Sequence, residues 1–238
     1  MKRVWLLAMV MVGVLFGAGG MWLAQRVAPG ELGAADEARI GRAVRDYVLA
    51  NPEIIPQAMQ RLQEKDAARA VAASRGAIEQ PYPGAMIGNP DGDVTLVEYY
   101  DYNCGFCRAS VPTLEQLVAG DRNLRVVFKE LPVLSDESRS AARAALAAAR
   151  QGKFKAFHDA LYAAGPVSDA TIAQSAKATG VDLAKIPADA DETIRTNLET
   201  AAKLGVTGTP SWVIGDQVLS GALPIERLKE AIARARAG

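Results

Sequence analysis

The sequence is poor in the residues that build disulfide frameworks and metal centres. Two cysteines, Cys104 and Cys107, and one histidine, His158, occur among 238 residues. Two cysteines exclude a small disulfide-stapled scaffold and cannot alone complete a four-ligand zinc site. The 27 Lys and Arg balance the 27 Asp and Glu, so no basic excess indicates nucleic acid as a partner. A hydrophobic content of 50% excludes a disordered or collagenous chain.

The one long hydrophobic run lies at the N-terminus. Lys2 and Arg3 precede an uncharged stretch at 4–24, which is the pattern of an export signal. The stretch is also long enough to cross a bilayer as a helix of about 20 residues. We therefore expect residues 1–28 to be either a cleaved signal peptide or a retained anchor. Both predict that the rest of the chain lies in the oxidising periplasm, where paired cysteines can cycle as a disulfide.

A helical pattern follows from Glu31 to about Arg75, with a break at Asn51-Pro52. Two helices with narrow apolar stripes cannot cover each other and stay soluble alone. We expect region 29–80 to pack either on the main domain or on further copies of this chain. The charged, Ala-rich stretch 66–77 predicts weak tertiary anchoring. The apolar residues of the stripes are Ile40, Val44, Tyr47, Val48, Ile54, Ile55, Met59 and Leu62.

The remainder, 81–238, has the order of a small α/β domain. A β-branched and aromatic strand at 94–100 leads into a turn at 101–107 and then a helix. A second strand at 124–129 follows, and this order makes a right-handed parallel unit the default.

A helical insertion then interrupts the predicted sheet over about 135–204. A hairpin at 211–219 and a helix at 224–236 close the chain. The pattern therefore predicts an α/β fold with an inserted helical domain and an N-terminal helical extension.

Cys104 and Cys107 form a C-x-x-C motif at the predicted strand-to-helix turn. Cys104 falls at or just before the first helical turn, where free N–H groups and the helix dipole favour an anion. Its thiolate is thereby stabilised, which also favours the reduced pair and makes the disulfide a stronger oxidant. Cys107, one turn on, points inward. We predict that Cys104 attacks substrate disulfides and that Cys107 resolves the mixed disulfide.

Two other uses of the cysteines stay open at this point. A static disulfide would close so short a loop that it restrains little of the unfolded chain. Monovalent copper on two thiolates is chemically plausible. A metal site would need further ligands, and His158 is the one imidazole in the sequence. It is remote from the cysteines in a predicted amphipathic helix, where a core or surface position is more typical than a metal ligand. We therefore predict no resident metal.

The strand 97–100, the run 101–108 (DYNCGFCR) and the later run 205–210 (GVTGTP) resemble DsbA-type thioredoxin-fold thiol–disulfide oxidoreductases. The resemblance covers about residues 86–238. It implies a thioredoxin fold that includes the helical insertion.

The resemblance also implies roles for particular residues. Pro210 is expected to be cis and to face the cysteines, and Thr209 to offer backbone hydrogen bonds to an extended substrate. Glu98 is expected to be a buried acid beneath the active site, with Lys129 as its charge partner. A buried carboxylate near Cys107 can accept a proton during resolution, and pairing with a cation would lower the cost of its burial.

Between the cysteines the sequence departs from the strong oxidases of this family, which typically have Pro-His there. Gly105 and Phe106 occupy these positions. Without an imidazole to help the thiolate, we expect a milder oxidant. Phe106 is expected to form an exposed apolar rim that binds unfolded substrate, together with Gly105, Thr209 and Pro210.

The N-terminal extension resembles the oligomerisation region of exported family members related to the suppressor of copper sensitivity protein C, mainly at 47–53 (YVLANPE). In that subgroup the region gathers several catalytic domains, typically three, and favours disulfide isomerisation. Several thiolates around a common cleft hold one misfolded substrate at high effective concentration. The resemblance thus implies a homo-oligomer such as a trimer.

These features predict an exported thiol–disulfide oxidoreductase, specifically a protein disulfide isomerase, that works through a Cys104 mixed disulfide. We expect no bound cofactor, because a membrane redox partner supplies or removes the electrons. The expected substrates are unfolded or misdisulfided exported proteins. Three alternatives remain: a monomeric dithiol oxidase, a copper-binding or copper-delivery protein that uses the same cysteines, and an assembly module whose C-x-x-C motif is structural.

Overall fold

The computed structural model of the protein describes residues 33–237. The predicted signal or anchor at 1–28, with its apolar stretch 4–24, lies outside the described residues. Among the residues described, no helix combines the length and hydrophobicity needed to span a membrane. By its internal contacts the chain divides into two compact units, 1–59 and 60–238.

Two helices form at the N-terminal end, α2 (Ala34–Ala50) and α3 (Ile54–Glu79). The expected break at Asn51-Pro52 is present, but Asn51 ends the first helix and does not cap the second. Its side-chain amide donates to the Tyr47 carbonyl at 2.8 Å. Pro56 falls in the first turn of α3, where N–H groups have no intrahelical acceptor, so it breaks no hydrogen bond of the helix.

The second unit is built on a five-stranded sheet with the order β1-β3-β2-β4-β5. Strands β2 and β3 are parallel, as predicted, and the other pairs are antiparallel. Every residue of the central strand β2 is buried. The short β1, which the sequence pattern did not indicate, pairs with β3. The strands are β1 (Met86–Gly88), β2 (Val94–Tyr100), β3 (Leu124–Glu130), β4 (Ser211–Ile214) and β5 (Gln217–Ser220).

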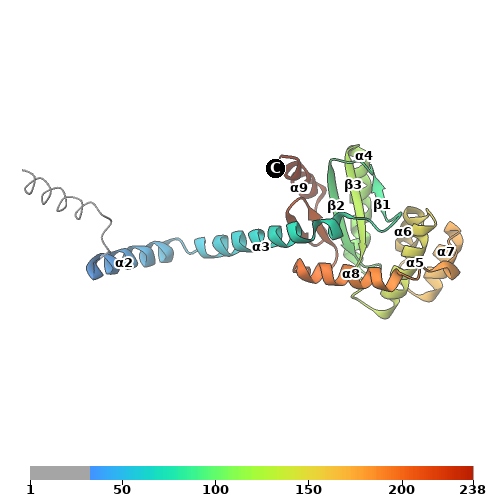
Figure 1. The fold of residues 1–238 in the computed structure, drawn as a ribbon, viewed down its shortest axis with the longest axis horizontal. Helices are drawn as coiled ribbons and strands as arrows, with labels where there is room; N and C mark the ends of the chain where they lie inside the picture. The colour runs from blue at the N-terminus through green and yellow to red at the C-terminus, as the bar shows by residue number, and fades with distance from the viewer. Residues whose placement is uncertain (1–32, 238) are drawn as a thin grey trace, which may run out of the picture. The chain divides into compact units, whose positions relative to one another are not determined.

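The helices of this unit follow the predicted order, and Figure 1 shows α5, α6 and α7 gathered beside the sheet. Ser135 and Ser168 cap α5 and α7 with their side chains. The helices are α4 (Gly105–Gly120), α5 (Asp136–Arg150), α6 (Phe154–Ala163), α7 (Asp169–Thr179), α8 (Ala190–Lys203) and α9 (Ile225–Ala237), with a 3-10 turn at Leu183–Lys185.

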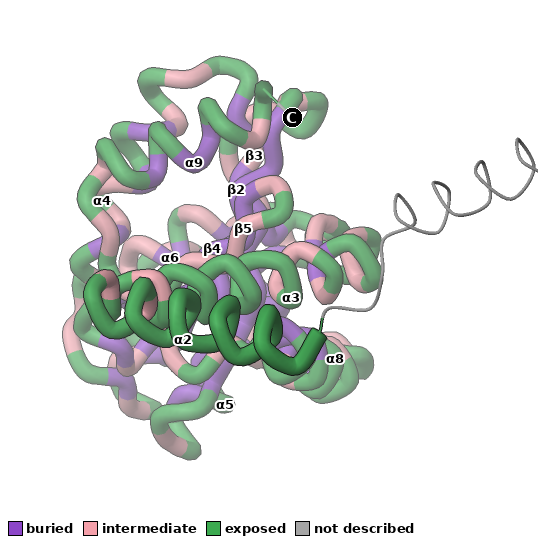
Figure 2. Tube along the Cα trace, turned by 90° about the vertical axis from the view of Figure 1, so that its left-hand side faces the viewer, coloured by how far each residue is buried: buried purple, intermediate pink, exposed green. Residues whose placement is uncertain are grey.

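Alternate residues of β2 serve two separate cores, one on each face of the sheet. Leu96 and Tyr100 pack with residues of α4, the insertion and α9. Val97 and Tyr99 pack on the opposite face with α3 and the end of α8. Figure 2 shows the resulting concentration of buried residues along β2 and β3.

The second face of the sheet decides where the domain begins. Val71 and Ile78 of α3 are completely buried against it. The prediction that 66–77 is weakly anchored is therefore wrong, and by its internal contacts the second compact unit begins at residue 60, within α3. The apolar face of β2 and β3 needs a cover, and the small side chains of this Ala-rich helix allow it to pack closely.

The expected linker after α3 is also packed. Tyr82 is buried, and its hydroxyl donates to Asp189 Oδ1 at 2.9 Å and accepts from Arg150 Nε at 3.1 Å. These bonds tie the segment that leads into β1 to the helical insertion.

Candidate active site

Cys104 lies where β2 gives way to α4, as the motif predicts. It is the N-cap of α4, and its Sγ accepts from the backbone N–H of Cys107 at 3.4 Å. Its own backbone N–H donates to the carbonyl of Asp101 at 3.0 Å, which fixes the turn. The sulfur therefore lies at the positive end of a helix, where N–H groups and the dipole stabilise an anion.

The segment before β4 reaches the same sulfur. The Thr209-Pro210 peptide bond is cis. Cys104 Sγ donates to the Thr209 carbonyl at 3.2 Å, although the two residues are far apart in the sequence. The geometry implied by the resemblance, a cis proline facing the cysteines, is thus present.

The two cysteines and the residues between them differ in access. Cys107 has an exposed fraction of 1%, Cys104 of 6% and Phe106 of 69%. Burial raises the pKa of the Cys107 thiol, and the negative charge of Glu98 raises it further. Cys107 is therefore held as a thiol inside the fold, next to an exposed apolar side chain that marks the surface of the site. The cysteines are not bridged in this structure.

Glu98 lies on β2 beneath the cysteines and is almost completely buried. Burial raises its pKa to about 8, and negative charge at Cys104 contributes in the same direction. No hydrogen bond or ion pair to the Glu98 carboxyl occurs among the residues that the structure describes. A carboxyl group in this state exchanges its proton near neutral pH.

Residues 95–233 match the family described as DSBA-like thioredoxin domain. The chain belongs to the DsbA-like thioredoxin family. Residues 36–69 also match the Copper resistance protein ScsC N-terminal domain, which covers α2 and part of α3. The α/β thioredoxin fold with an inserted helical domain and an N-terminal extension is confirmed, and the site described above is that of a DsbA-like protein.

Solved structures agree with this assignment. A linker-deletion mutant of Proteus mirabilis ScsC is 32% identical, with a TM-score of 0.70 over 88% of this chain and 99% of that one. A thioredoxin-like oxidoreductase from Silicibacter pomeroyi is 38% identical, with a TM-score of 0.66 over 69% of this chain and 98% of that one. Family models and solved neighbours thus agree on a DsbA-like thioredoxin domain preceded by an ScsC-type N-terminal domain.

The curated relatives that match are much longer proteins. The Na(+)/H(+) antiporter NhaA 1 of Salinispora arenicola is 30% identical over 220 residues, which is 86% of this chain and 34% of that protein. The chain therefore spans about a third of the length of the curated relatives it matches.

Lys129 is not the partner of Glu98, contrary to the expectation from the DsbA-like pattern. In the parallel register Glu98 is aligned with Phe128, whereas Lys129 is aligned with Tyr99. Side chains alternate between faces along a strand, so the ammonium group and the carboxyl group lie on opposite faces of the sheet. Lys129 Nζ instead donates to the carbonyls of Ala77 at 2.9 Å and Gln80 at 2.7 Å, at the C-terminal end of α3.

Sequence reasoning missed a second buried acid on the Glu98 face. Glu130 follows Lys129 and is aligned with Tyr100, whose hydroxyl donates to Glu130 Oε1. Burial raises the pKa of Glu130 well above its usual value. The sequence shows that Glu130 directly follows Lys129 at the end of β3. Only the strand register shows which of these two side chains lies on the same face as Glu98.

Asp101 is the residue that holds the active-site turn, and sequence reasoning did not single it out. Its carboxylate is buried and accepts bonds from two neighbouring segments. The donors are Asn103 N at 2.8 Å, Val133 N at 2.9 Å, Leu134 N at 3.0 Å and Ser138 Oγ at 2.6 Å. An Asp directly after a buried strand is a usable signal, because such side chains often bond to nearby backbone N–H groups.

Replacement of Glu98 with glutamine is expected to stabilise the reduced protein increasingly as pH rises. The folded pKa of about 8 lies above the ordinary glutamate value of 4.5, so the folded state holds the proton more tightly between these values. Stability therefore falls as pH rises through this window, by about 1.4 kcal/mol per pH unit at most, and Glu98→Gln removes that loss. Urea unfolding from pH 5 to pH 8 measures the difference.

The exposed Glu226→Gln variant controls for the loss of one carboxylate charge. If the free energy of unfolding changes with pH in the same way in the wild type and in Glu98→Gln from pH 5 to pH 8, the result would contradict an unpaired buried acid at this position.

Proposed function

We propose that this chain is an exported, periplasmic protein disulfide isomerase whose nucleophile is Cys104. The observation that carries the proposal is the position of its sulfur, between the Cys107 N–H at the start of α4 and the Thr209 carbonyl. The N–H groups at the start of α4 stabilise negative charge at this sulfur, and the bond to the Thr209 carbonyl shows that the backbone before β4 lies beside it. The expected roles of the site residues follow from this geometry.

The reaction is a pair of thiol–disulfide exchanges. The Cys104 thiolate attacks a substrate disulfide, which forms a mixed disulfide and releases one substrate thiolate. The released thiolate can attack another substrate disulfide and rearrange it. Alternatively, Cys107 passes its proton to Glu98 and attacks Cys104, so that the substrate leaves reduced and the enzyme leaves oxidised.

Apolar side chains around the cysteines support an unfolded protein as the substrate. Phe106, Val133 and Leu134 have exposed fractions of 69%, 50% and 55%. The carboxylate of Asp101 holds the backbone of the last two beside the active-site turn. An apolar rim next to a nucleophile suits segments that are exposed only before folding is complete. Gly105, Thr209 and Pro210 complete the proposed substrate surface.

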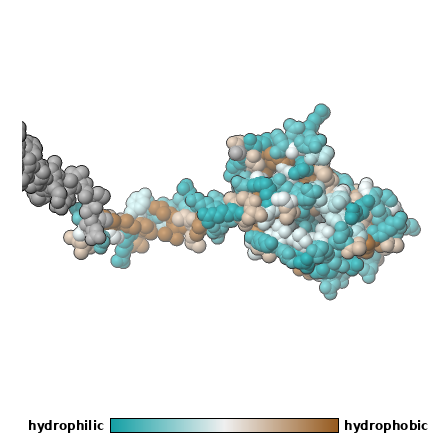
Figure 3. Space-filling model, in the orientation of Figure 1, coloured by the Kyte–Doolittle hydropathy of each residue, from teal (hydrophilic) through white to brown (hydrophobic). Residues whose placement is uncertain are grey.

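The N-terminal helices support self-association, with three copies as the arrangement proposed from the family resemblance. Helix α2 buries none of its residues, although Ile40, Val44 and Tyr47 recur along one face. Figure 3 shows hydrophobic side chains on the surface of this part of the chain. A 17-residue helix is marginal in water by itself, so a partner for its apolar face stabilises it.

The proposed partners beyond substrate are a membrane redox protein and other copies of this chain. The pair of thiols carries the electrons itself, so the proposed cycle needs no resident cofactor. Residues 1–28 are proposed either to be removed on export or to anchor the chain to the inner membrane.

Loss of self-association is expected to lower isomerase activity and to spare dithiol oxidation. Val44→Asp with Tyr47→Asp places charge on the apolar face of α2, and Arg42→Asp places it on the other side of the same helix. Reactivation of scrambled ribonuclease and the mass by light scattering are measured for the wild type, the double variant and Arg42→Asp, each without residues 1–28.

The expected result is a monomer with at least about 10-fold weaker reactivation for the double variant, and wild-type behaviour for Arg42→Asp. An unchanged mass for the double variant would contradict the oligomer. Equal reactivation by monomer and oligomer would favour the dithiol oxidase, and no reactivation with stoichiometric copper binding would favour the copper protein.

A further inference from the structure

The only histidine of the sequence lies in the core of the catalytic unit. His158 is 2% exposed and packs among aromatic rings that include Tyr100, Tyr102 and Phe128. Burial lowers its pKa to about 3, and the nearby charge of Lys155 contributes. The imidazole is therefore neutral, and the exchange reaction described above gives it no role.

His158 is one end of a continuous line of polar atoms in this core. Its Nδ1 is bonded to the Tyr102 hydroxyl at 3.1 Å, and that hydroxyl is bonded to the Tyr100 hydroxyl at 3.3 Å. The Tyr100 hydroxyl is also bonded to Glu130 Oε1. We call Glu130, Tyr100, Tyr102 and His158 the buried polar chain. Each member exchanges protons through an O–H or N–H group, so a proton can pass from one end to the other.

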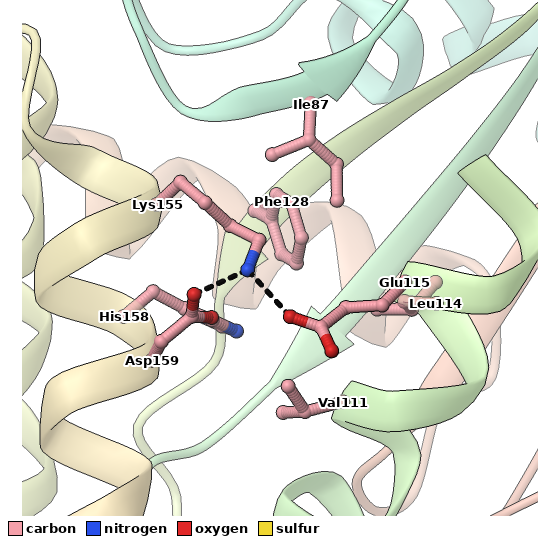
Figure 4. A pocket seen from close by; sticks show the side chains of 8 residues that line it. All are labelled: Ile87, Val111, Leu114, Glu115, Phe128, Lys155, His158 and Asp159. Atoms are coloured by element: carbon pink, nitrogen blue, oxygen red, sulfur yellow. Dashed lines mark hydrogen bonds and ion pairs between the residues drawn. The ribbon is translucent and has the colours of Figure 1, made fainter. Parts of the chain in front are cut away.

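The histidine end of the buried polar chain reaches a pocket between α4 and α6, shown in Figure 4. His158 lines this pocket together with Lys155, whose ammonium group is bound by Glu115 at 2.8 Å and by Asp159. These three charged side chains are 37–52% exposed. Water therefore reaches the charged side chains at the opening of the pocket that the imidazole of His158 lines.

The glutamate end of the buried polar chain lies next to Glu98. The register aligns Tyr100 with Glu130, so Glu98 and Glu130 are two residues apart in register on one face of adjacent parallel strands. Such diagonal neighbours are roughly 7–8 Å apart at the backbone. No direct hydrogen bond joins the two carboxyl groups among the described residues, so the proposed path between them runs through one water. The negative charge of Glu98 also raises the pKa of Glu130.

We propose that the buried polar chain is a proton relay that carries the proton of Cys107 between Glu98 and solvent at the pocket between α4 and α6. The inference rests on the proposed thiol–disulfide exchange. Its members are relay residues, because none of them is hydrogen-bonded to Cys104 or Cys107 Sγ among the described residues.

The proton balance of the resolving step shows why a relay is needed. Cys107 gives its proton to the Glu98 carboxylate and attacks Cys104, which forms the intramolecular disulfide and releases the substrate thiolate. Glu98 passes the proton to Glu130, and a neutral imidazole takes it at one ring nitrogen while releasing one from the other. The net result is one proton delivered to solvent and one taken up there by the substrate thiolate.

Oxidation of the reduced full chain by excess glutathione disulfide separates the two steps. The Cys104 mixed disulfide with glutathione forms first, and its decay measures resolution by Cys107. Tyr100→Phe and His158→Asn interrupt the relay at two points. Tyr99→Phe is the matched control, because Tyr99 is the neighbour of Tyr100 on the opposite face and its buried hydroxyl has no hydrogen-bond partner within residues 33–237.

In the relay variants the mixed disulfide is expected to form at the wild-type rate and to decay at least about 10-fold more slowly. Proton transfer then limits the decay, so its solvent isotope effect should be larger than in the wild type, and added imidazole buffer should restore the wild-type decay rate. The double variant should be no slower than either single one, because both interrupt one path. A purely structural role for these residues would not produce rescue by a buffer.

Decay in Tyr100→Phe at the rate of Tyr99→Phe would overturn the relay, as would losses that multiply in the double variant. If His158→Asn does not fold, Tyr102→Phe replaces it, since it keeps the ring and removes only the hydroxyl. A wild-type chain that forms no mixed disulfide would instead contradict the proposed exchange reaction, so the two failures are distinguishable.

Discussion

Replacement of Cys104 with alanine is expected to abolish disulfide exchange with every substrate, because no other sulfur is accessible at the start of α4. Cys107 is 1% exposed, and its thiol is held protonated by burial and by the charge of Glu98. We expect residual activity at the level of the uncatalysed reaction, measured by reactivation of scrambled ribonuclease and by oxidation of a dithiol peptide.

Cys107→Ala is the matched variant and is expected to give a different result. It keeps the nucleophile but removes the resolving thiol, so covalent complexes between Cys104 and substrate accumulate and are seen on a non-reducing gel. Covalent complexes formed through Cys107 in the Cys104→Ala chain would reverse the assigned roles. Equal activity of Cys104→Ala and Cys107→Ala would contradict the assignment of different roles to the two cysteines.

Replacement of Asp101 with alanine is expected to lower the free energy of unfolding by about 3–5 kcal/mol. The substitution removes the acceptor of three part-buried backbone N–H groups and of the buried Ser138 hydroxyl. The turn that carries Cys104 also loses three of its bonds to the segment at 133–138, so alkylation of Cys104 by iodoacetamide is expected to change in rate.

Urea unfolding measures this loss, and Asp91→Ala is the control because Asp91 is exposed in a loop. Its expected effect is within about 0.5 kcal/mol. A loss of under 1 kcal/mol for Asp101→Ala would show that water replaces the carboxylate at this position and that the turn does not depend on it.

Much of the site was predictable from the sequence because its geometry is local. A C-x-x-C motif between a strand and a helix places Cys104 at the helix N-terminus, whatever surrounds it. The low exposure of Cys107 follows from the helical period, and the high exposure of Phe106 from its place between two inward residues. The helical insertion was likewise predicted from the sequence over about 135–204, because helix start and stop signals are local.

The partner of Glu98 was not predictable, because it depends on the register between two strands. A shift of one residue exchanges the faces of a strand, so Lys129 and Glu130 are equally plausible from the sequence. The structure aligns Glu130 with Tyr100 and turns Lys129 toward the end of α3. Glu98 consequently lies in the core without a cation, and a second acid accompanies it.

By itself, the sequence determined which sulfur lies at the helix terminus and which elements surround it, because those features depend on neighbours within a few residues. Only the tertiary structure decided which charged side chains share a face with the cysteines and where α3 joins the domain. It also decided that His158 ends a line of buried hydroxyl groups. The physical reason is that pairing across strands and the cover of a sheet face depend on contacts between segments far apart in the chain, and a one-dimensional pattern does not specify them.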